Sequence, residues 1–295
     1  MRIYVIGAEG QVARSLREAA SRQGDIVFRC SHRPDVDILS PTSIQAALEH
    51  FRPDVVINPA AYTAVDRAED EPDQAFAVNR DGAGIVAAAA AKLDVPIIHF
   101  STDYVFDGLK RSAYVETDAV APQGVYGHSK LAGEKLVAAA NPGHLILRTS
   151  WVYAPFGNNF VRTMLRLGQE RDVVRVVNDQ IGCPTYAPDI ADAVLAISRR
   201  ISGATDRARY SGIYHMAGPD AVTWCDFARV IFNGCAARDS RVVRVDPIPS
   251  FEYPTKAIRP ANSRLATDKL TSDFGLRFPA MESSLANCLD RLFSQ

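Results

Sequence analysis

Cysteine and histidine are sparse in this chain of 295 residues, and neither is arranged as a metal site or a disulfide framework. The five cysteines are scattered, odd in number and never spaced as CxxC, and the six histidines form no HExxH pattern. Zinc sites and disulfide scaffolds normally show such regular spacing. The sequence therefore predicts reduced thiols, as in a cytoplasm, and gives metal catalysis no support.

Long apolar runs and a surplus of charge are also missing. The longest apolar stretch, residues 85–91, is short and rich in alanine, so no membrane span is expected. Residues 3–8 are apolar, but glycines interrupt this region and a polar helix follows, so we expect no signal peptide. The net charge of −1 argues against a dedicated nucleic-acid binder, which would usually be basic.

Strand-like and helix-like segments alternate over the first half of the chain. Short apolar strands are expected at residues 2–6, 25–30, 54–58, 95–100 and 145–152. The helices between them are expected at residues 11–21, 41–51, 73–93 and 131–140, with Ser40 as the N-cap of the second. Strands separated by helices of this length pair in parallel through right-handed crossovers. This pattern predicts the α/β class, with a Rossmann-type doubly wound parallel sheet.

The pattern changes from about residue 151 onward. Short elements at residues 175–177, 213–217 and 242–245 alternate with helices near residues 188–200, 224–232 and 280–293, and residues 203–211 and 247–259 read as loops. No clean linker separates the two parts. We expect residues 1–150 to form the main domain and residues 151–295 a smaller C-terminal α/β lobe, with some segments returning to the main sheet.

Small residues follow the first strand in the spacing GxxGxxA, formed by Gly7, Gly10 and Ala13. Gly7 lets the backbone turn tightly, and Gly10 lets a pyrophosphate approach the free N–H groups of the next helix. The spacing departs from GxGxxG, and a plain strand-to-helix turn also favours glycine. Its place at the start of a βαβ pattern nevertheless favours dinucleotide binding by residues 1–150.

The segment after the second strand bears on which dinucleotide binds. An acidic residue there usually holds the ribose of NAD, but no carboxylate occurs before Asp35. Guanidinium and hydroxyl groups stand there instead, and they can pair with a 2′-phosphate. This favours NADP(H), with NADH left open, although the arginines could be ordinary solvated charges. The candidates for contact with the adenosine end are Arg29, Ser31, Arg33, Asp37 and Ile38.

Tyr126 and Lys130 are one helical turn apart, so they share a face if this segment is helical. A neighbouring ammonium can stabilise the tyrosine anion and so make the tyrosine a better proton donor to a carbonyl oxygen. Thr102 follows a buried strand, and ligands of open α/β sheets bind outside the carboxyl ends of the strands. These three residues are therefore the predicted catalytic group, although YxxxK alone is often just a surface pair.

Taken together, these motifs and Asn58-Pro59-Ala60-Ala61-Tyr62 resemble the extended short-chain dehydrogenases/reductases. Longer strings resemble, in order over nearly the whole chain, the dTDP-4-dehydrorhamnose reductase family within that superfamily. They are GAEGQV, NPAAYTAVDRAE, FAVN, STDYVFDG, YGHSKLAGE, RTSWVY, DQIGCPTY and RPANSRL. A shared glycine turn is common, but this collinear set is specific.

The resemblance implies NADPH-dependent reduction of a dTDP-linked 6-deoxy-4-keto sugar at C4, giving dTDP-L-rhamnose, the last step in making that sugar donor for cell-surface polysaccharide. It implies Tyr126 as proton donor, Lys130 as its tuner and a ribose ligand, and Thr102 as polariser of the keto group. Implied cofactor contacts are Gly7, Gly10, Gln11, Val12, Ala60, Ala61, Tyr62 and Asn79. Implied substrate contacts are Asp103, Tyr104, Val105, Trp151 and Arg259, with Asp66 either a further one or a helix cap.

Several alternatives remain open at this stage. Trp151 could be a core residue, and Arg259 could belong to a structural ion pair. Another sugar-nucleotide reductase or a 4-epimerase stays possible, whereas Tyr104 stands where a 4,6-dehydratase usually has a carboxylate. A noncatalytic regulatory subunit of the same fold would be expected to lose Thr102, Tyr126 or Lys130. A homodimer is possible, and Mg²⁺ is possible although the terminal helix offers only Glu282 and Asp290.

Overall fold

Six parallel strands form the main sheet of the computed structural model, which describes residues 1–204, 206–239 and 242–294. The strands lie in the order β10-β5-β4-β3-β1-β2. Their bounds are Arg2–Ile6 for β1, Val27–Ser31 for β2, Val55–Asn58 for β3, Ile97–Thr102 for β4, His144–Thr149 for β5 and Gly212–His215 for β10. The predicted doubly wound parallel sheet is confirmed.

The strand order contains one switch point, between β1 and β3. The chain runs outward from β1 to β2 at the edge and then returns to β3 on the other side of β1. Connections that leave two neighbouring strands in opposite directions open a crevice at the strands' carboxyl ends. Gly7 follows β1 there and approaches the segment after β3 closely, because a Cβ on Gly7 would lie 3.4 Å from Cβ of Ala60.

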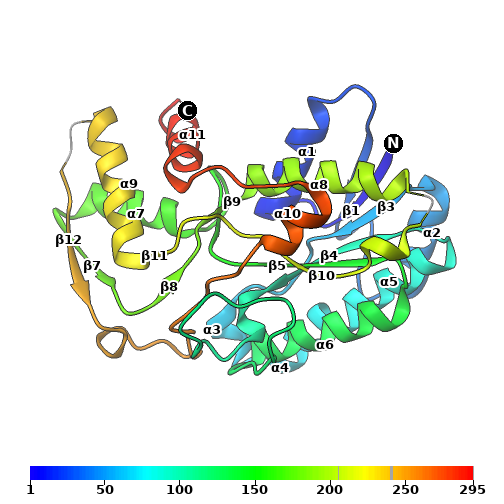
Figure 1. Cartoon of the computed structure of the whole chain (residues 1–295), viewed down its shortest axis with the longest axis horizontal. Helices are drawn as coiled ribbons and strands as arrows, with labels where there is room; N and C mark the ends of the chain where they lie inside the picture. The colour runs from blue at the N-terminus through cyan, green and yellow to red at the C-terminus, as the bar shows by residue number, and fades with distance from the viewer. Residues whose placement is uncertain (205, 240–241, 295) are drawn as a thin grey trace.

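Helices cover both faces of this sheet (Figure 1). On one face α1 (Gln11–Ser21) packs beside α8 (Ala187–Ser202), and Leu16 and Val194 are fully buried between them and the sheet. The other face carries α2 (Pro41–Phe51), α5 (Ala83–Lys92) and α6 (Val125–Ala140) over a second apolar layer. Helix α8 thus brings a segment from the second half of the chain back onto the main sheet.

A smaller unit lies at the other end of the molecule, on the left of Figure 1. Parallel strands β7 (Val173–Val177) and β12 (Arg244–Ile248) pack with α7 (Phe160–Glu170), α9 (Trp224–Asp239) and α11 (Met281–Phe293) around their own apolar core. Two short pairings connect this unit to the sheet: β6 (Val152–Tyr153) with β9 (Thr185–Tyr186), and β8 (Ile181–Gly182) with β11 (Val222–Thr223). Strand β10 pairs with β5 of the main sheet, and α10 (Asp268–Phe274), which was not predicted, packs beside β10.

The helix predicted at residues 73–93 is interrupted. It consists of α4 (Pro72–Phe76), a wide π-helical turn η1 (Ala77–Gly82) and α5. Helix α6 passes very close to this turn, since a Cβ on Gly133 would lie 2.0 Å from the carbonyl oxygen of Asn79. A π turn displaces the backbone locally, and such turns often occur at functional sites. Periodicity alone did not reveal it.

Further predictions were wrong in detail. The helix expected at residues 131–140 begins at Val125, and the strand expected at residues 242–245 runs from Arg244 to Ile248. The strand predicted at residues 145–152 ends at Thr149, because Trp151 has a φ of 50° and turns the chain before β6. Strand β4 runs two residues further than predicted and includes Ser101 and Thr102. Helix α7 was not predicted at all, although its N-cap Asn159 accepts a hydrogen bond from the Arg162 amide at 3.1 Å.

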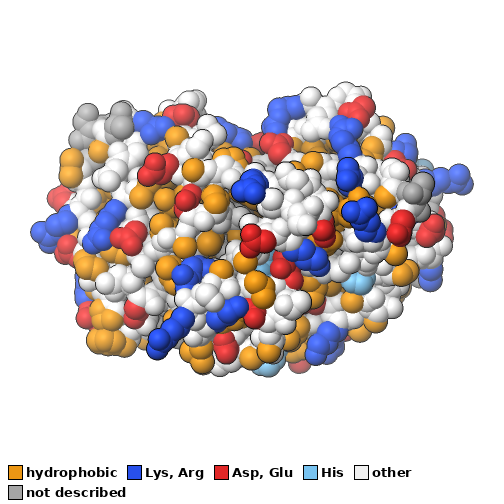
Figure 2. All heavy atoms as spheres, in the orientation of Figure 1, with side chains coloured by type: hydrophobic (Ala, Val, Ile, Leu, Met, Phe, Trp, Pro, Cys, Tyr) orange, Lys and Arg blue, Asp and Glu red, His pale blue; other side chains and the backbone are white. Residues whose placement is uncertain are grey.

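Basic and acidic side chains are interspersed over the face shown in Figure 2, in keeping with the near-neutral net charge. Within the described ranges, none of the helices is both long and apolar enough to cross a bilayer. The short elements that complete the fold are α3 (Val65–Ala68), η2 (Asp103–Val105), η3 (Ala208–Tyr210) and η4 (Ser250–Glu252).

Candidate functional site

Thr102 is the last residue of β4 and also caps the short helical turn η2. Its Oγ1 donates to Oδ1 of Asp103 at 3.0 Å and accepts from the amide of Tyr104 at 3.2 Å. Only 5% of Thr102 is exposed. The hydroxyl is therefore held in one place at the carboxyl end of a central strand, where ligands of such sheets bind.

Tyr126 is the second residue of α6 and is half-buried beside η2. Its ring meets that of Tyr104 edge-on, with centroids 5.5 Å apart at 77°. Burial raises the pKa of Tyr126 well above its ordinary value, while a hydrogen bond with the Thr102 side chain acts in the opposite direction. Gly127 makes this approach possible, because a Cβ there would lie 2.3 Å from the Tyr104 carbonyl oxygen.

Lys130 lies one turn further along α6 and is only 2% exposed. Its Nζ donates to the Phe100 carbonyl oxygen at 2.6 Å and lies 3.5 Å from Nε2 of His99. Burial lowers the pKa of Lys130 to about 8, and the nearby Glu134 carboxylate opposes that shift. The structure thus places Thr102, Tyr126 and Lys130 around the end of β4, as the sequence predicts.

Asp103 follows Thr102 and is 4% exposed. Burial raises the pKa of Asp103 to about 6, against hydrogen bonds with the Ser263 and Thr102 side chains that lower it. Val105 is completely buried in an apolar cluster with Phe106, so its side chain faces the core. Of the segment predicted to line the substrate pocket, Asp103 and Tyr104 carry the polar groups.

Arg259 joins this site from the second part of the chain. Its Nη1 donates to the Tyr104 hydroxyl at 3.1 Å, and its Nη2 donates to Oδ2 of Asp66 at 2.5 Å. Asp66 also accepts from the amide of Ala257 at 3.0 Å through Oδ1. Asp66 lies in α3 and therefore anchors the 257–259 segment beside Tyr104 and Tyr126.

The glycine turn after β1 has the form of an anion site. Gly7 has a φ of 101°, which only glycine adopts easily, and a Cβ on Gly10 would meet no atom within 4 Å. No side chain of the described residues caps the N-terminus of α1, so its first N–H groups stay available to an anion. The side chain of Gln11 contacts Asn159 and the Val152 carbonyl, whereas Val12 packs on the core.

The candidates on β2 and after it have diverse environments, and Arg29 and Ser31 are part of the strand itself. Arg29 is exposed, and Arg33 is an exposed partner of Asp37 at 3.2 Å. Ser31 is buried, and its hydroxyl donates to that of Tyr4 at 2.7 Å. Ile38 is buried in the core against Gly82, where a Cβ would meet it at 3.0 Å. Arg29 is thus the freest basic group at this end of the sheet.

Asn79 is buried and uses its amide to hold other parts of the site. It accepts from the amide of Tyr62 at 2.8 Å and donates to the Tyr62 carbonyl at 3.1 Å and to Oγ of Ser129 at 2.9 Å. Ser129 in turn donates to the carbonyl of Tyr126 at 2.8 Å. The partly buried loop that follows β3, with Ala60, Ala61 and Tyr62, is therefore tied to the first turn of α6.

Trp151 stacks face to face on Trp224, with ring centroids 3.3 Å apart at 7°. Gly182 is needed beside it, because a Cβ there would lie 2.3 Å from Cε2 of the indole. Trp151 is only half-buried, so it is not a core tryptophan. It also lies beyond the end of β5, which stops at Thr149. Its partner Trp224 was not singled out from the sequence, and only the fold brings the two rings together.

A buried ion pair behind the site was also missed. Glu134 accepts from Nε of Arg148 at 2.9 Å and from Nη2 at 2.7 Å, and Ser101 donates to the same carboxylate at 2.5 Å. The YGHSKLAGE string contains Glu134, but nothing in that string indicates its partner on β5. The pair joins the helix that carries Tyr126 and Lys130 to strands β4 and β5.

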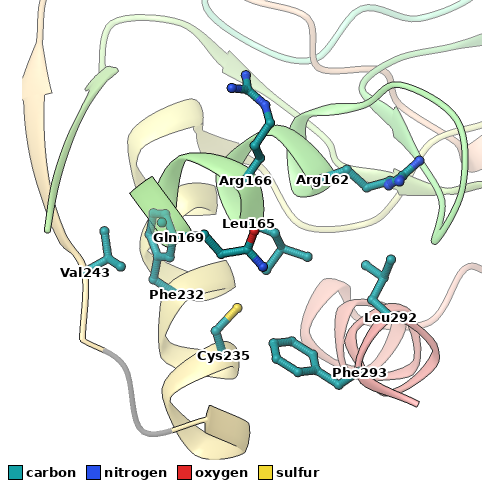
Figure 3. A pocket seen from close by; sticks show the side chains of 10 residues that line it. Arg162, Leu165, Arg166, Gln169, Phe232, Cys235, Val243, Leu292 and Phe293 are labelled. Carbon is teal, nitrogen blue, oxygen red and sulfur yellow. The ribbon is translucent and has the colours of Figure 1, made fainter. Parts of the chain in front are cut away.

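A separate hollow of about 380 Å³ lies in the smaller unit, between α7, α9 and α11 (Figure 3). Its lining includes Arg162, Arg166, Phe232 and Phe293, and none of the predicted site residues. In the ranges the structure covers, no three His, Cys, Asp or Glu side chains gather as a metal site. Asp290, one of the two carboxylates noted in the terminal helix, is paired with Arg238 at 2.6 Å.

Known proteins of one family are similar to this chain over nearly its full length. The family model described as RmlD substrate binding domain matches residues 1–294. A dTDP-4-dehydrorhamnose reductase of Sinorhizobium fredii is 48% identical over 96% of this chain and 95% of its own.

Two solved structures are also similar over nearly their full length. The dTDP-4-dehydrorhamnose reductase of Clostridium acetobutylicum has a TM-score of 0.90 at 36% identity, covering 99% of both chains. The Bacillus anthracis enzyme of that name, in complex with NADP, has a TM-score of 0.89 at 35% identity over 98% of both. The chain therefore belongs to the dTDP-4-dehydrorhamnose reductase family.

Proposed function

We propose that this protein reduces the C4 keto group of dTDP-4-dehydro-6-deoxy-L-mannose with NADPH and releases dTDP-L-rhamnose. The observation that carries the proposal is the convergence of Thr102 and Tyr126 at the end of β4, with Lys130 buried one turn behind. A reduction of this kind needs hydrogen-bond donors aimed at the oxygen on which charge develops. The names of the relatives point to the same reaction.

The residues at the switch point fit a dinucleotide. The uncapped N-terminus of α1 and the open space before Gly10 suit a pyrophosphate, and Gly7 leaves room beside Ala60. The exposed guanidinium of Arg29 suits a 2′-phosphate at the edge of the sheet. NADPH, when bound, supplies the hydride that C4 receives. In this proposal residues 1–150 form the NADP(H)-binding domain.

Tyr126 supplies the proton that the carbonyl oxygen takes up. Because burial raises its pKa, the phenol stays protonated at neutral pH, as a proton donor must. A charged Lys130 nearby stabilises the phenolate that remains after transfer. Thr102 orients the same oxygen by a second hydrogen bond. Asn79 and Ser129 act through Tyr126 by holding the first turn of α6 in place.

The sugar nucleotide would occupy the space between η2 and the smaller unit. Tyr104 and Arg259 would bind it there, with the guanidinium facing the diphosphate and oriented by Asp66. Trp151 would present an indole face or edge to the sugar or base from its stack on Trp224. Residues 151–295 would therefore be mainly a substrate-binding lobe.

We also include in the proposal a homodimer, which the resemblance leaves possible, and a cytoplasmic location, which the cysteine pattern favours. No disulfide joins any of the described cysteines, in keeping with a reducing compartment. NADPH and nucleotide sugars are cytoplasmic metabolites, so the substrates would meet the enzyme there. Sedimentation of the purified protein over a range of concentrations tests the dimer.

The activity is tested by mixing the protein with NADPH and enzymatically prepared dTDP-4-dehydrorhamnose, following the reduced-nicotinamide absorbance and identifying the sugar product by NMR. The proposal expects one NADPH oxidised per dTDP-L-rhamnose formed. Conversion of the sugar without NADPH consumption would favour a 4-epimerase, and a talose-type product would show hydride delivery to the other face. Neither consumption nor conversion, with NADPH bound, would favour a regulatory role.

A further inference from the structure

The hydrogen bonds around Thr102 leave it no proton to offer a substrate. A threonine hydroxyl has one proton and two acceptor lone pairs. Its proton points to Oδ1 of Asp103, one lone pair accepts from the Tyr104 amide, and the Tyr126 hydroxyl is the third group in hydrogen-bonding contact with it. An ionised carboxylate only accepts, so Thr102 must donate to it. As long as Asp103 is ionised, the hydroxyl cannot also donate to a keto oxygen.

The second carboxyl oxygen of Asp103 indicates how this arrangement can change. Oδ2 is buried and makes no hydrogen bond of good geometry within the described residues, although the Ser263 hydroxyl lies near the carboxyl group; Asp103 as a whole is 4% exposed. A buried carboxylate oxygen without a partner is costly, because it has lost its hydration without replacement. Binding one proton removes that charge and turns the carboxyl group into a donor.

One proton then reverses the direction of the hydrogen bonds. A neutral Asp103 donates its O–H to Oγ1 of Thr102, and the Tyr104 amide fills the other lone pair. The Thr102 proton becomes free to point at the carbonyl oxygen that Tyr126 also contacts. We propose that Asp103 is a positioning residue that works in its protonated form and directs the Thr102 hydroxyl to the substrate ketone. This inference rests on the proposed function.

The surroundings of Asp103 favour that proton. Its neighbours with titratable groups are Tyr104 on its own turn, Tyr126 on α6 and Cys183 after β8, and Ser263 adds an uncharged hydroxyl. Burial raises the pKa of each of these three groups, so all are neutral near pH 7 and none offers a compensating positive charge. Burial correspondingly raises the pKa of Asp103 to about 6.

The sign of the pH effect follows from this arrangement. As the pH rises through the pKa of Asp103, the carboxyl group ionises. The carboxylate then accepts the hydrogen bond from the Thr102 hydroxyl again, so that hydroxyl no longer points at the substrate. The value of kcat/KM should then fall by about tenfold per pH unit above that pKa, since kcat/KM reports the free enzyme's ionisations. Asp103→Asn carries an amide that can donate to Thr102 at any pH, so this decline should vanish.

The test measures kcat/KM for dTDP-4-dehydrorhamnose between about pH 5 and pH 7.5, below the pKa of about 8 at which Lys130 loses its charge, in the wild type, Asp103→Asn and Thr102→Val. We expect the decline only in the wild type, because Thr102→Val lacks the hydroxyl through which Asp103 acts and should be slow but independent of pH. A decline that persists in Asp103→Asn or in Thr102→Val overturns the inference. An inactive wild type overturns the proposed function, and this inference with it.

A second measurement does not depend on turnover. Infrared difference spectra of the wild type with NADPH bound should show the carbonyl stretch of a protonated carboxyl group that disappears as the pH rises through the kinetic pKa. Binding of NADPH, followed by its fluorescence, should be unchanged in Asp103→Asn. A wild type with no such band anywhere in the range would contradict the inference.

Discussion

Arg148 on β5 and Glu134 on α6 form a bidentate ion pair, in which Nε and Nη2 of the arginine donate to the carboxylate at 2.9 and 2.7 Å. Both side chains are no more than 3% exposed. The pair lies directly behind the proposed catalytic residues, because Glu134 is one turn from Lys130 and also accepts from Ser101. It holds α6 against the strands whose ends form the site.

Arg148→Met should lower the free energy of unfolding by about 3–5 kcal/mol, since it leaves the Glu134 carboxylate buried without its partner. The double variant Arg148→Met with Glu134→Leu should lose clearly less, because neither charge then remains. Urea unfolding of both variants measures the difference. Equal losses would show that the pair's charge is not what stabilises this packing.

Gly127→Ala should displace η2 from α6, because the new Cβ would lie 2.3 Å from the Tyr104 carbonyl oxygen. Backbone atoms cannot move aside cheaply, and overpacking of this kind costs about 1–3 kcal/mol. We expect kcat to fall through misplacement of Tyr126. Gly84→Ala is the matched control, since its Cβ meets only the flexible Leu136 side chain at 3.1 Å. Similar kcat values in both variants would show that the close contact between Gly127 and Tyr104 does not position Tyr126.

Arg259→Gln should raise KM for the sugar nucleotide by about 10- to 100-fold, as expected when a charged hydrogen bond to a diphosphate is lost. NADPH binding should not change. Lys256→Gln is the control, because Lys256 lies on the same loop as Arg259 and pairs with Asp70, but both side chains of that pair are more than half exposed. If the two variants behave alike, Arg259 is only a structural partner of Asp66.

Arg29→Ala should raise KM for NADPH by about tenfold or more and leave KM for NADH unchanged, because only NADPH carries the 2′-phosphate. Arg166→Ala removes an equally exposed guanidinium from α7 and should alter neither constant. Steady-state kinetics with both cofactors settles the point. Equal effects of Arg29→Ala on NADPH and NADH would exclude a role in cofactor choice.

Lys130 should make stability depend on pH in a defined direction. Its pKa falls from 10.5 in the unfolded chain to about 8 in the folded protein, so between these values the unfolded chain binds more protons. Its contribution to stability is therefore complete above about pH 10.5 and is lost as the pH falls through about 8. Over that range the wild type should gain about 3 kcal/mol relative to Lys130→Met. A pH-independent difference in urea unfolding would contradict the lowered pKa.

The sequence predicts local structure well where neighbouring residues determine it. Strand β1 and helix α1 have the predicted bounds, and Ser40 caps α2 as expected, accepting from the Ser43 amide at 3.3 Å. The early end predicted for β4 has a simple cause. Ser101 and Thr102 are polar and therefore looked like loop residues. Ser101 can nevertheless be buried in the strand, because Glu134 on α6 accepts a hydrogen bond from its hydroxyl.

Relationships between distant segments could not be predicted from local pattern. The turn at Trp151 depends on Gly182 and Trp224, and the partner of Arg259 lies 193 residues away in Asp66. The resemblance singled out Asn79 as a cofactor contact, but not its hydrogen bonds with Tyr62 and Ser129. Hydrogen-bond partners of this kind follow only from the folded chain.

The most direct test of the whole account is reduction of dTDP-4-dehydrorhamnose by wild type, Tyr126→Phe and the exposed control Tyr253→Phe, each shown first to bind NADPH. The account predicts oxidation of NADPH by the wild type and Tyr253→Phe at the same rate, and a loss of at least about 100-fold in Tyr126→Phe, the usual size of a general-acid contribution. Near-wild-type turnover by Tyr126→Phe would contradict it, because the proton would then come from another group.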